Sequence, residues 1–169
     1  VQKERKLLKT FPYKEGYSLY IGIPFCPSTC LYCSFTSYSI DQFENIVQDY
    51  LEALLKELDF VAKTYAHKEL QTMYIGGGTP TSLKEEDLEY LLYEVNKRFP
   101  FSKIQEITVE AGRPDSLNFE KLKILKKYGV TRISINPQSM NDKTLKLIGR
   151  NHFAQDIKEK FNLARQAGI

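Results

Sequence analysis

Short apolar runs alternate along this chain with longer segments in which apolar residues recur every three or four positions. Runs of the first kind predict buried strands, and segments of the second kind predict helices with one apolar face. The predicted strands are residues 17–23, 71–75, 104–110 and 130–136. A helical segment follows each of them, so the chain should form four strand-helix units.

Four helical segments are recognised by apolar residues that share one face. These residues are Phe43, Val47, Tyr50, Leu51, Leu54, Leu58 and Val61, then Leu88, Leu91, Leu92 and Val95, then Phe119, Leu122, Leu125 and Tyr128, and finally Phe153, Ile157, Phe161 and Ala164. Ser82 and Glu85 have the spacing of a capping box, which predicts the start of the second helix. Asn118 should cap the third helix, and Asn141 should cap a short extra helix before the last one.

The alternation of strands and helices predicts an α/β fold with a parallel sheet. Connections between parallel strands are right-handed almost without exception. In such folds the loops that bind ligands gather at the carboxyl ends of the strands. We therefore expect the chemistry of this chain in the loops that follow its four strands.

Composition narrows the class of protein without assigning a function. The 169 residues suffice for one domain, and a net charge of +3 is too small to indicate nucleic-acid binding. Every apolar stretch is interrupted well before the roughly 20 residues that a membrane span requires. Residues 1–9 are basic but lack the apolar segment and cleavage site of a secretory signal, which predicts a cytoplasmic protein.

All three cysteines of the chain lie in one loop, directly after the first predicted strand. Cys26, Cys30 and Cys33 are an odd number at short spacing, which favours a metal or redox site over a disulfide framework. A four-iron cluster held by three thiolates keeps one iron open for another ligand. A zinc site would need further ligands such as His67 or His152, and a redox pair formed by Cys30 and Cys33 would leave Cys26 without a role.

The cysteine spacing, with Tyr32 before the last cysteine and Ser34-Phe35 after it, resembles the radical S-adenosylmethionine (SAM) superfamily. This resemblance implies that the three cysteines hold a 4Fe-4S cluster whose open iron binds the amino and carboxylate groups of SAM. One electron passed to the sulfonium would then release methionine and a 5'-deoxyadenosyl radical. A cluster with this role must be strongly reducing, which its protein environment can bring about.

Glycines end the second predicted strand, in the segment Gly76-Gly77-Gly78-Thr79-Pro80. Glycine lets backbone groups approach a ligand closely, although the same residues also form ordinary tight turns. The resemblance makes this segment the GGE-like motif of the superfamily, whose backbone groups contact the methionine amino group. Gly77, Gly78 and Thr79 match that motif.

Five further residues near strand ends or the cysteines are candidate SAM contacts. Glu110 ends the third strand and can accept hydrogen bonds from ribose hydroxyls or an ammonium, or else cap the following turn. Gln138 and Arg150 can donate to ligand oxygens, and Arg150 has the alternative of a cation at a helix C-terminus. Tyr20 and Tyr32 are candidate adenosyl or methionine contacts, or else packing residues. No catalytic residue is assigned.

One branch of the superfamily resembles this sequence more closely. Residues 20–26, the segment GGGTPTSL and residues 132–138 are similar to oxygen-independent coproporphyrinogen III oxidases, especially the HemZ type, and to haem chaperones of the HemW type. The oxidase resemblance implies decarboxylation of coproporphyrinogen III to protoporphyrinogen IX in haem biosynthesis. It also implies an external electron donor such as flavodoxin or ferredoxin.

Two segments bear on the choice between oxidase and chaperone. Phe35 stands where the best-known oxidases have a further cysteine, and the chaperone type shares this phenylalanine. Residues 110–115 and 136–138 look closer to the oxidase variant, which we therefore favour. The alternatives are a chaperone that binds and delivers haem, and a radical SAM enzyme with another substrate.

Related domains are partial (β/α)6 barrels, so the resemblance implies that about four of six strand-helix units are present. Residues 1–16 would form a lead-in, and residues 17–169 a radical SAM core domain truncated at its C-terminal end. Absent units would leave an unpaired strand edge and uncovered apolar helix faces. We therefore expect residues 1–169 alone to be inactive.

Overall fold

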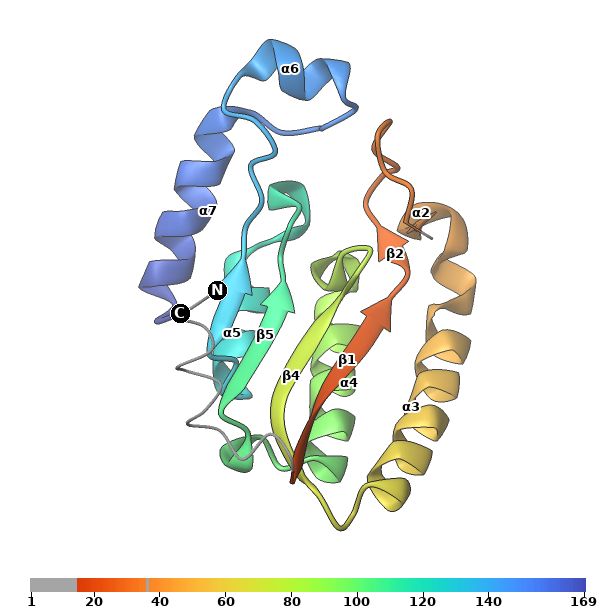
Figure 1. The fold of residues 1–169 in the computed structure, drawn as a ribbon. Helices are drawn as coiled ribbons and strands as arrows, with labels where there is room; N and C mark the ends of the chain where they lie inside the picture. The colour runs from red at the N-terminus through yellow and green to blue at the C-terminus, as the bar shows by residue number, and fades with distance from the viewer. Residues whose placement is uncertain (1–14, 36) are drawn as a thin grey trace.

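The computed structural model describes residues 15–35 and 37–169 of the chain. Its main sheet has four strands, β1 (Gly16–Ile23), β4 (Glu69–Gly77), β5 (Glu106–Glu110) and β6 (Arg132–Ser134). They pair in the order β1-β4-β5-β6, all parallel, and end at one edge of the sheet (Figure 1). The predicted parallel α/β sheet is confirmed, whereas the predicted lead-in lies almost wholly outside the described residues.

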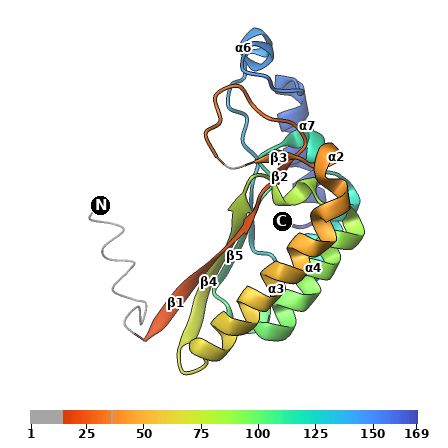
Figure 2. The same ribbon diagram turned by 90° about the vertical axis from the view of Figure 1, so that its right-hand side faces the viewer.

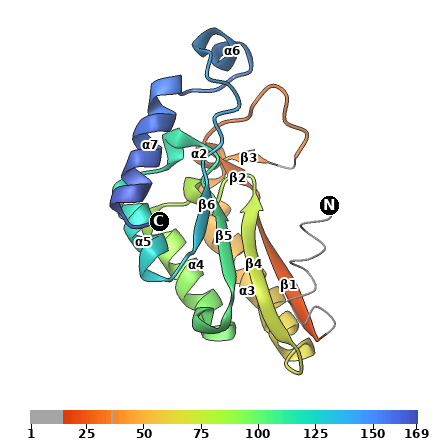
Figure 3. The ribbon, with the colours of Figure 1, turned by 60° about the vertical axis from the view of Figure 1, so that its left-hand side comes forward.

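A helix follows each main strand and packs on the same side of the sheet. These helices are α3 (Val47–Thr64), α4 (Glu85–Arg98), α5 (Phe119–Lys127) and α7 (Ala154–Gln166). In a view turned by 90°, the sheet lies on one side of the molecule and α3 and α4 on the other (Figure 2). Among the described residues no helix covers the opposite face, which we call the open face (Figure 3). None of the described helices is both long and apolar enough to cross a membrane.

Shorter elements join these units. They are β2 (Phe25–Cys26), β3 (Tyr38–Ser39), α2 (Ile40–Phe43), α6 (Asp142–Leu147) and single 3-10 turns at Glu44–Ile46, Pro80–Ser82, Phe101–Lys103 and Pro114–Ser116. The side chain of Asn118 accepts a hydrogen bond from the backbone of α5, and that of Asn141 from the backbone of α6, as predicted. The cysteine loop and α6 lie beyond the carboxyl ends of the strands (Figures 1 and 2).

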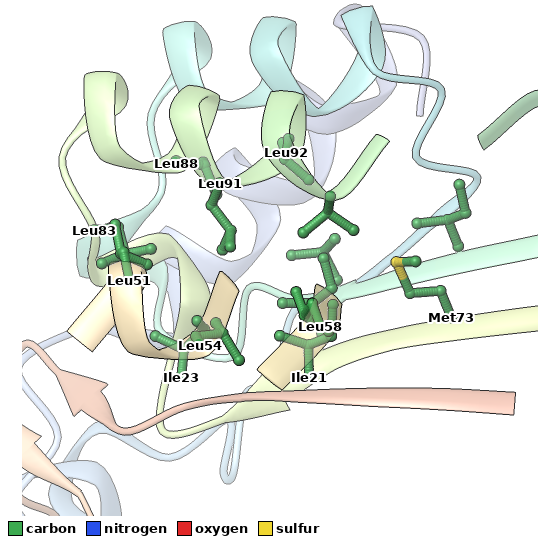
Figure 4. Packing of buried hydrophobic residues seen from close by; sticks show 14 of the residues in the cluster. Ile21, Ile23, Leu51, Leu54, Leu58, Met73, Leu83, Leu88, Leu91 and Leu92 are labelled. Carbon is green, nitrogen blue, oxygen red and sulfur yellow. The ribbon is translucent and has the colours of Figure 1, made fainter. Parts of the chain in front are cut away.

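Leucines of the helices and branched residues of the sheet form the hydrophobic core (Figure 4). Side chains alternate between the two faces of a strand, so Ile21 and Ile23 of β1 and Met73 of β4 point toward the helices. The residues of the other parity belong to the open face: Ser18, Tyr20, Thr72, Tyr74, Glu106, Thr108, Glu110, Arg132 and Ser134. The sheet is therefore apolar toward the helices and polar or aromatic on its open face.

The predicted capping box at the start of α4 is wrong. Ser82 belongs to a 3-10 turn, and its hydroxyl donates to the backbone oxygens of Thr79 at 2.6 Å and Phe25 at 3.1 Å. Lys84 precedes the first residue of α4, and no side chain caps the helix. The hydroxyl of Ser82 thus ties the glycine segment to the cysteine loop instead of capping a helix.

Three aromatic residues of the predicted helical apolar faces are exposed, and of these Phe119 was predicted to be buried. Phe119 is 39% exposed, and Phe153 and Phe161 of the last helical segment are 64% and 51% exposed. The rings of Phe119 and Phe161 lie against the cations Lys123 and Arg165. Because β6 is the edge strand of the described sheet, α7 has a strand beneath it on one side only.

Candidate functional site

The cysteine loop is closed at its base by a short pair of strands. Phe25 of β2 pairs with Tyr38 of β3, and residues 26–35 lie beyond the carboxyl end of the sheet. The loop also reaches the turn after α6, because the backbone N–H of Leu31 donates to the oxygen of Ile148 at 3.2 Å. All three cysteines are free and partly exposed on this loop.

The glycine segment holds the first part of this loop in place. The backbone N–H of Gly78 donates to the oxygen of Ile23, and that of Thr79 to the oxygen of Phe25, both at 2.7 Å. The hydroxyl of Thr79 lies 3.3 Å from Sγ of Cys26. Burial raises the pKa of the Cys26 thiol, while this hydroxyl and the charge of Arg113 oppose the rise. The predicted cofactor residues Gly78 and Thr79 therefore lie directly beside a predicted metal ligand.

Glu110 reaches across the sheet edge toward two tyrosines of the open face. Its carboxylate accepts a hydrogen bond of 2.5 Å from the hydroxyl of Tyr74, whose ring stacks on Tyr20 at 5.7 Å between centroids. A Cβ at Gly76 would lie only 2.9 Å from the Glu110 carboxylate and 2.7 Å from the Tyr74 ring. The first glycine of the segment therefore leaves the space that Glu110 and Tyr74 occupy. Tyr20 remains 60% exposed.

Arg150 also contacts the cysteine loop. Its buried guanidinium donates to the hydroxyl of Tyr32 at 2.9 Å and 3.2 Å and to the backbone oxygen of Gly112 at 3.0 Å. Two predicted SAM contacts thus bind each other. Gln138 is exposed and has a left-handed backbone, with φ of 59°, and among the described contacts it joins none of these groups.

Arg113 is a site residue that sequence reasoning missed. It is buried after β5 and donates to Cys30 and Ser28 of the cysteine loop. The only sequence signal is an arginine three residues beyond the end of a strand, within residues 110–115, which resemble the oxidase variant. A contact between residues so distant in sequence leaves no periodic pattern.

The three cysteine thiols and their neighbours suit a cluster that is bound at three corners. Three free thiols share one loop, and the sulfur atoms of Cys26 and Cys30 each have a hydroxyl or guanidinium N–H beside them. Within the described residues, no three cysteine, histidine or carboxylate side chains converge on a single-ion site. A four-iron cluster binds each cysteine at a different iron, so its ligands need not converge in that way.

We predict that Tyr74 titrates near pH 12 because of Glu110. The hydrogen bond to Glu110, followed by burial and the negative charge of Glu110, raises the pKa of Tyr74 from 10.0 to about 12. Between these pH values the folded protein retains a proton that the unfolded chain has lost, so stability falls as pH rises through this range. Ultraviolet difference titration should show a phenol step near pH 12 that Tyr74→Phe removes.

The matched variant is Glu110→Gln, which keeps the size of the side chain and removes its charge. This change should move the Tyr74 step back toward pH 10. An unaltered step in Glu110→Gln would show that the carboxylate does not hold the phenol proton.

Comparison with known proteins places this chain in a superfamily. The sequence model of the Radical SAM superfamily matches residues 20–169. The chain is 46% identical over 159 residues to the oxygen-independent coproporphyrinogen-III oxidase-like protein HemZ of Bacillus subtilis, covering 92% of this chain and 32% of that protein. It is also 46% identical over 154 residues to the heme chaperone HemW of Bacillus subtilis, covering 90% of this chain and 40% of that protein.

A solved structure has a similar fold. The coproporphyrinogen III oxidase HemN of Escherichia coli, described as a radical SAM enzyme, superposes with a TM-score of 0.79 at 27% identity. The match covers 96% of this chain and 37% of HemN. The chain thus spans about a third to two fifths of the length of these relatives. It belongs to the radical SAM superfamily, within the group that contains HemN, HemZ and HemW.

Proposed function

We propose that this chain supplies the cluster and SAM site of a protein that oxidatively decarboxylates coproporphyrinogen III to protoporphyrinogen IX. One observation carries the proposal. Three free cysteines lie on one loop at the carboxyl edge of a parallel sheet, tied to the glycine segment through Cys26 and Thr79. We also propose residues 17–169 as the radical SAM core domain, in line with the superfamily match.

In this proposal Cys26, Cys30 and Cys33 hold a 4Fe-4S cluster and leave one iron for SAM. When bound, the cluster supplies the electron that cleaves SAM and so starts hydrogen abstraction from a propionate side chain. The residues around the loop fix the ligands in position. Thr79 contacts the Cys26 sulfur, and Arg150 orients Tyr32 by donating a hydrogen bond to the Tyr32 hydroxyl.

The glycine segment and Glu110 would bind the polar groups of SAM. The N–H groups of Gly78 and Thr79 are already bonded to the end of β1 and to β2, so carbonyl oxygens are the groups this segment can offer. Carbonyl oxygens accept hydrogen bonds and therefore suit the methionine ammonium. The Glu110 carboxylate, fixed by Tyr74, would accept from ribose hydroxyls or the same ammonium.

The open face of the sheet supports a planar, polar substrate. The exposed, stacked rings of Tyr20 and Tyr74 offer an aromatic surface, and the side chains of Thr72 and Arg132 add a hydroxyl and a cation on the same face. A tetrapyrrole combines a macrocycle with carboxylate side chains. The tyrosine rings match the macrocycle, and the cation of Arg132 matches the carboxylates. An external one-electron donor, such as flavodoxin or ferredoxin, would supply the electron for SAM cleavage. A one-electron acceptor would take the electron that each propionate radical loses when it releases CO2.

A haem chaperone is the second candidate. Several relatives bear that name, among them HemW of Escherichia coli at 38% identity over 152 residues. Phe35 also agrees with the chaperone type and is 72% exposed on the cysteine loop. A chaperone would keep the cluster and SAM site but would bind haem without decarboxylating coproporphyrinogen III.

Product analysis separates the two candidates. The full-length protein, reconstituted anaerobically, is incubated with SAM, a low-potential reductant, a one-electron acceptor and coproporphyrinogen III. We expect 5'-deoxyadenosine together with protoporphyrinogen IX, in which two propionates of the substrate have become vinyl groups. Absence of both products, combined with stoichiometric haem binding, would replace the oxidase by the chaperone.

A further inference from the structure

A buried arginine outside the predicted site lies against the cysteine loop. Arg113 follows β5 by three residues, and only 3% of its side chain is exposed. Burying a guanidinium costs free energy unless partners satisfy its charge and its N–H groups. The partners of Arg113 therefore indicate what the residue does.

Each of the five N–H groups of Arg113 has an acceptor. Nε and Nη2 donate to the two carboxylate oxygens of Asp115, at 3.0 Å and 2.8 Å. Nη1 donates to the backbone oxygen of Ser28 at 3.0 Å and to Sγ of Cys30 at 3.4 Å. Nη2 also donates to Oγ of Ser28 at 2.9 Å. Three of these five bonds end on the cysteine loop.

The charge of Arg113 persists in this position. A guanidinium is not deprotonated in proteins, and the forked pair with the two carboxylate oxygens of Asp115 stabilises the charged form further. The sulfur of Cys30 therefore has a permanent cation and an N–H donor directly beside it. Asp115 provides a compensating negative charge at Nε and Nη2, whereas the contact with Cys30 is made by Nη1.

We propose that Arg113 is a positioning residue that holds Cys30 in its ligating place and raises the reduction potential of the cluster. This inference rests on the cluster site proposed above. The reduced cluster carries one more negative charge than the oxidised one. A neighbouring cation and a hydrogen bond to a ligand sulfur both stabilise the reduced form, and cluster potentials respond to these two influences.

A purely structural role for Arg113 leads to a different expectation. If the guanidinium only staples the β5 turn to the cysteine loop, the potential should not follow the sign of the charge that is removed. Arg113→Gln removes a positive charge, whereas Asp115→Asn removes a negative charge from the same ion pair. Opposite shifts of the potential in these two variants would therefore be specific to electrostatic control.

The experiment is a redox titration of the reconstituted full-length protein, followed by electron paramagnetic resonance (EPR). We expect a more negative midpoint potential in Arg113→Gln and a less negative one in Asp115→Asn. Arg113→Lys keeps the charge but loses the forked donors, so its shift should be negative and smaller. Unchanged potentials at parental iron content, or shifts of equal sign in Arg113→Gln and Asp115→Asn, would overturn the proposal.

Two further comparisons make the result specific. Arg98 is also paired with carboxylates, Asp59 and Glu94, but at the end of α4, so Arg98→Lys should leave the potential unchanged. If Arg113→Gln assembles no cluster, Arg113→Lys and Asp115→Asn decide the matter by opposed shifts or their absence. A parent protein without any cluster would refute the cluster site itself, whereas a parental cluster with unshifted variants would refute only the role of Arg113.

Discussion

In the full-length protein, replacement of Cys30 by alanine should abolish the four-iron EPR signal and reduce SAM cleavage to the level of a blank. A cluster needs three cysteine ligands on this loop, and the described chain offers no fourth cysteine as a substitute. The fold should persist, because Cys30 is only partly buried and its loss removes a single hydrogen bond from Arg113. We expect the free energy of unfolding of the cluster-free protein to change by less than about 1 kcal/mol.

The matched control is Ser34→Ala, an exposed position immediately after the last cysteine. This variant should assemble the cluster and release 5'-deoxyadenosine as the parent does. Iron and sulfide analysis, EPR and product quantification are made on all three proteins. A parental four-iron signal in Cys30→Ala would remove this cysteine from the ligand set.

Replacement of Gly78 by alanine should be the most destabilising single change in the glycine segment. The added Cβ would lie 2.6 Å from the backbone oxygen of Phe25 and 2.9 Å from that of Ile23. Backbone atoms cannot turn aside as a side-chain end can, so the segment must move and break its bonds to β1 and β2. We expect a loss of more than about 2 kcal/mol in the free energy of unfolding, measured by urea titration.

Gly112→Ala provides the control for this effect. The Cβ of this variant would meet only the side chain of Asn136, at 3.5 Å, which is an ordinary contact distance. Its free energy of unfolding should stay within about 1 kcal/mol of the parent value. Equal stabilities for Gly78→Ala and Gly112→Ala would show that the close approach of the glycine segment to β1 is absent in solution.

The sequence predicted most of the fold because its main elements carry strong local signals. Strand β1 is a compact run of apolar and aromatic residues, and α3 carries Leu51, Leu54 and Leu58 on one face. Asn118 and Asn141 act as caps because the cap bond depends only on the next three residues. Such features are decided within a few positions of the chain.

The sequence predictions were wrong where a contact distant in sequence outweighs local preference, and where periodicity overstates burial at a helix end. Ser82 has the spacing of a helix cap, but the oxygen of Phe25, 57 residues away, takes its hydroxyl. Phe119 fits a helical apolar face, yet it is the first residue of α5 and remains partly exposed. Helical periodicity alone does not show how deeply the first residue of a helix is buried.

The candidate site also divides into motifs that are visible in the sequence and contacts between residues distant in sequence. The three cysteines and the glycine segment were visible as motifs, since each is continuous in sequence. Arg113 bridges 85 positions to Ser28, and Tyr74 bridges 36 positions to Glu110, so neither pair could be anticipated from spacing. Arg150 was expected to face ligand oxygens, whereas the structure places its guanidinium on Tyr32. Its proposed contact with SAM stays a prediction.

Iron, acid-labile sulfide and EPR of the anaerobically prepared protein test the central claim most directly, with and without SAM. We predict four irons and four sulfides per chain, and a reduced-cluster signal that changes when SAM binds the open iron. Protein that contains zinc, or that has no inorganic sulfide after reconstitution, would contradict the assignment of the cysteine loop and the tetrapyrrole chemistry that depends on it.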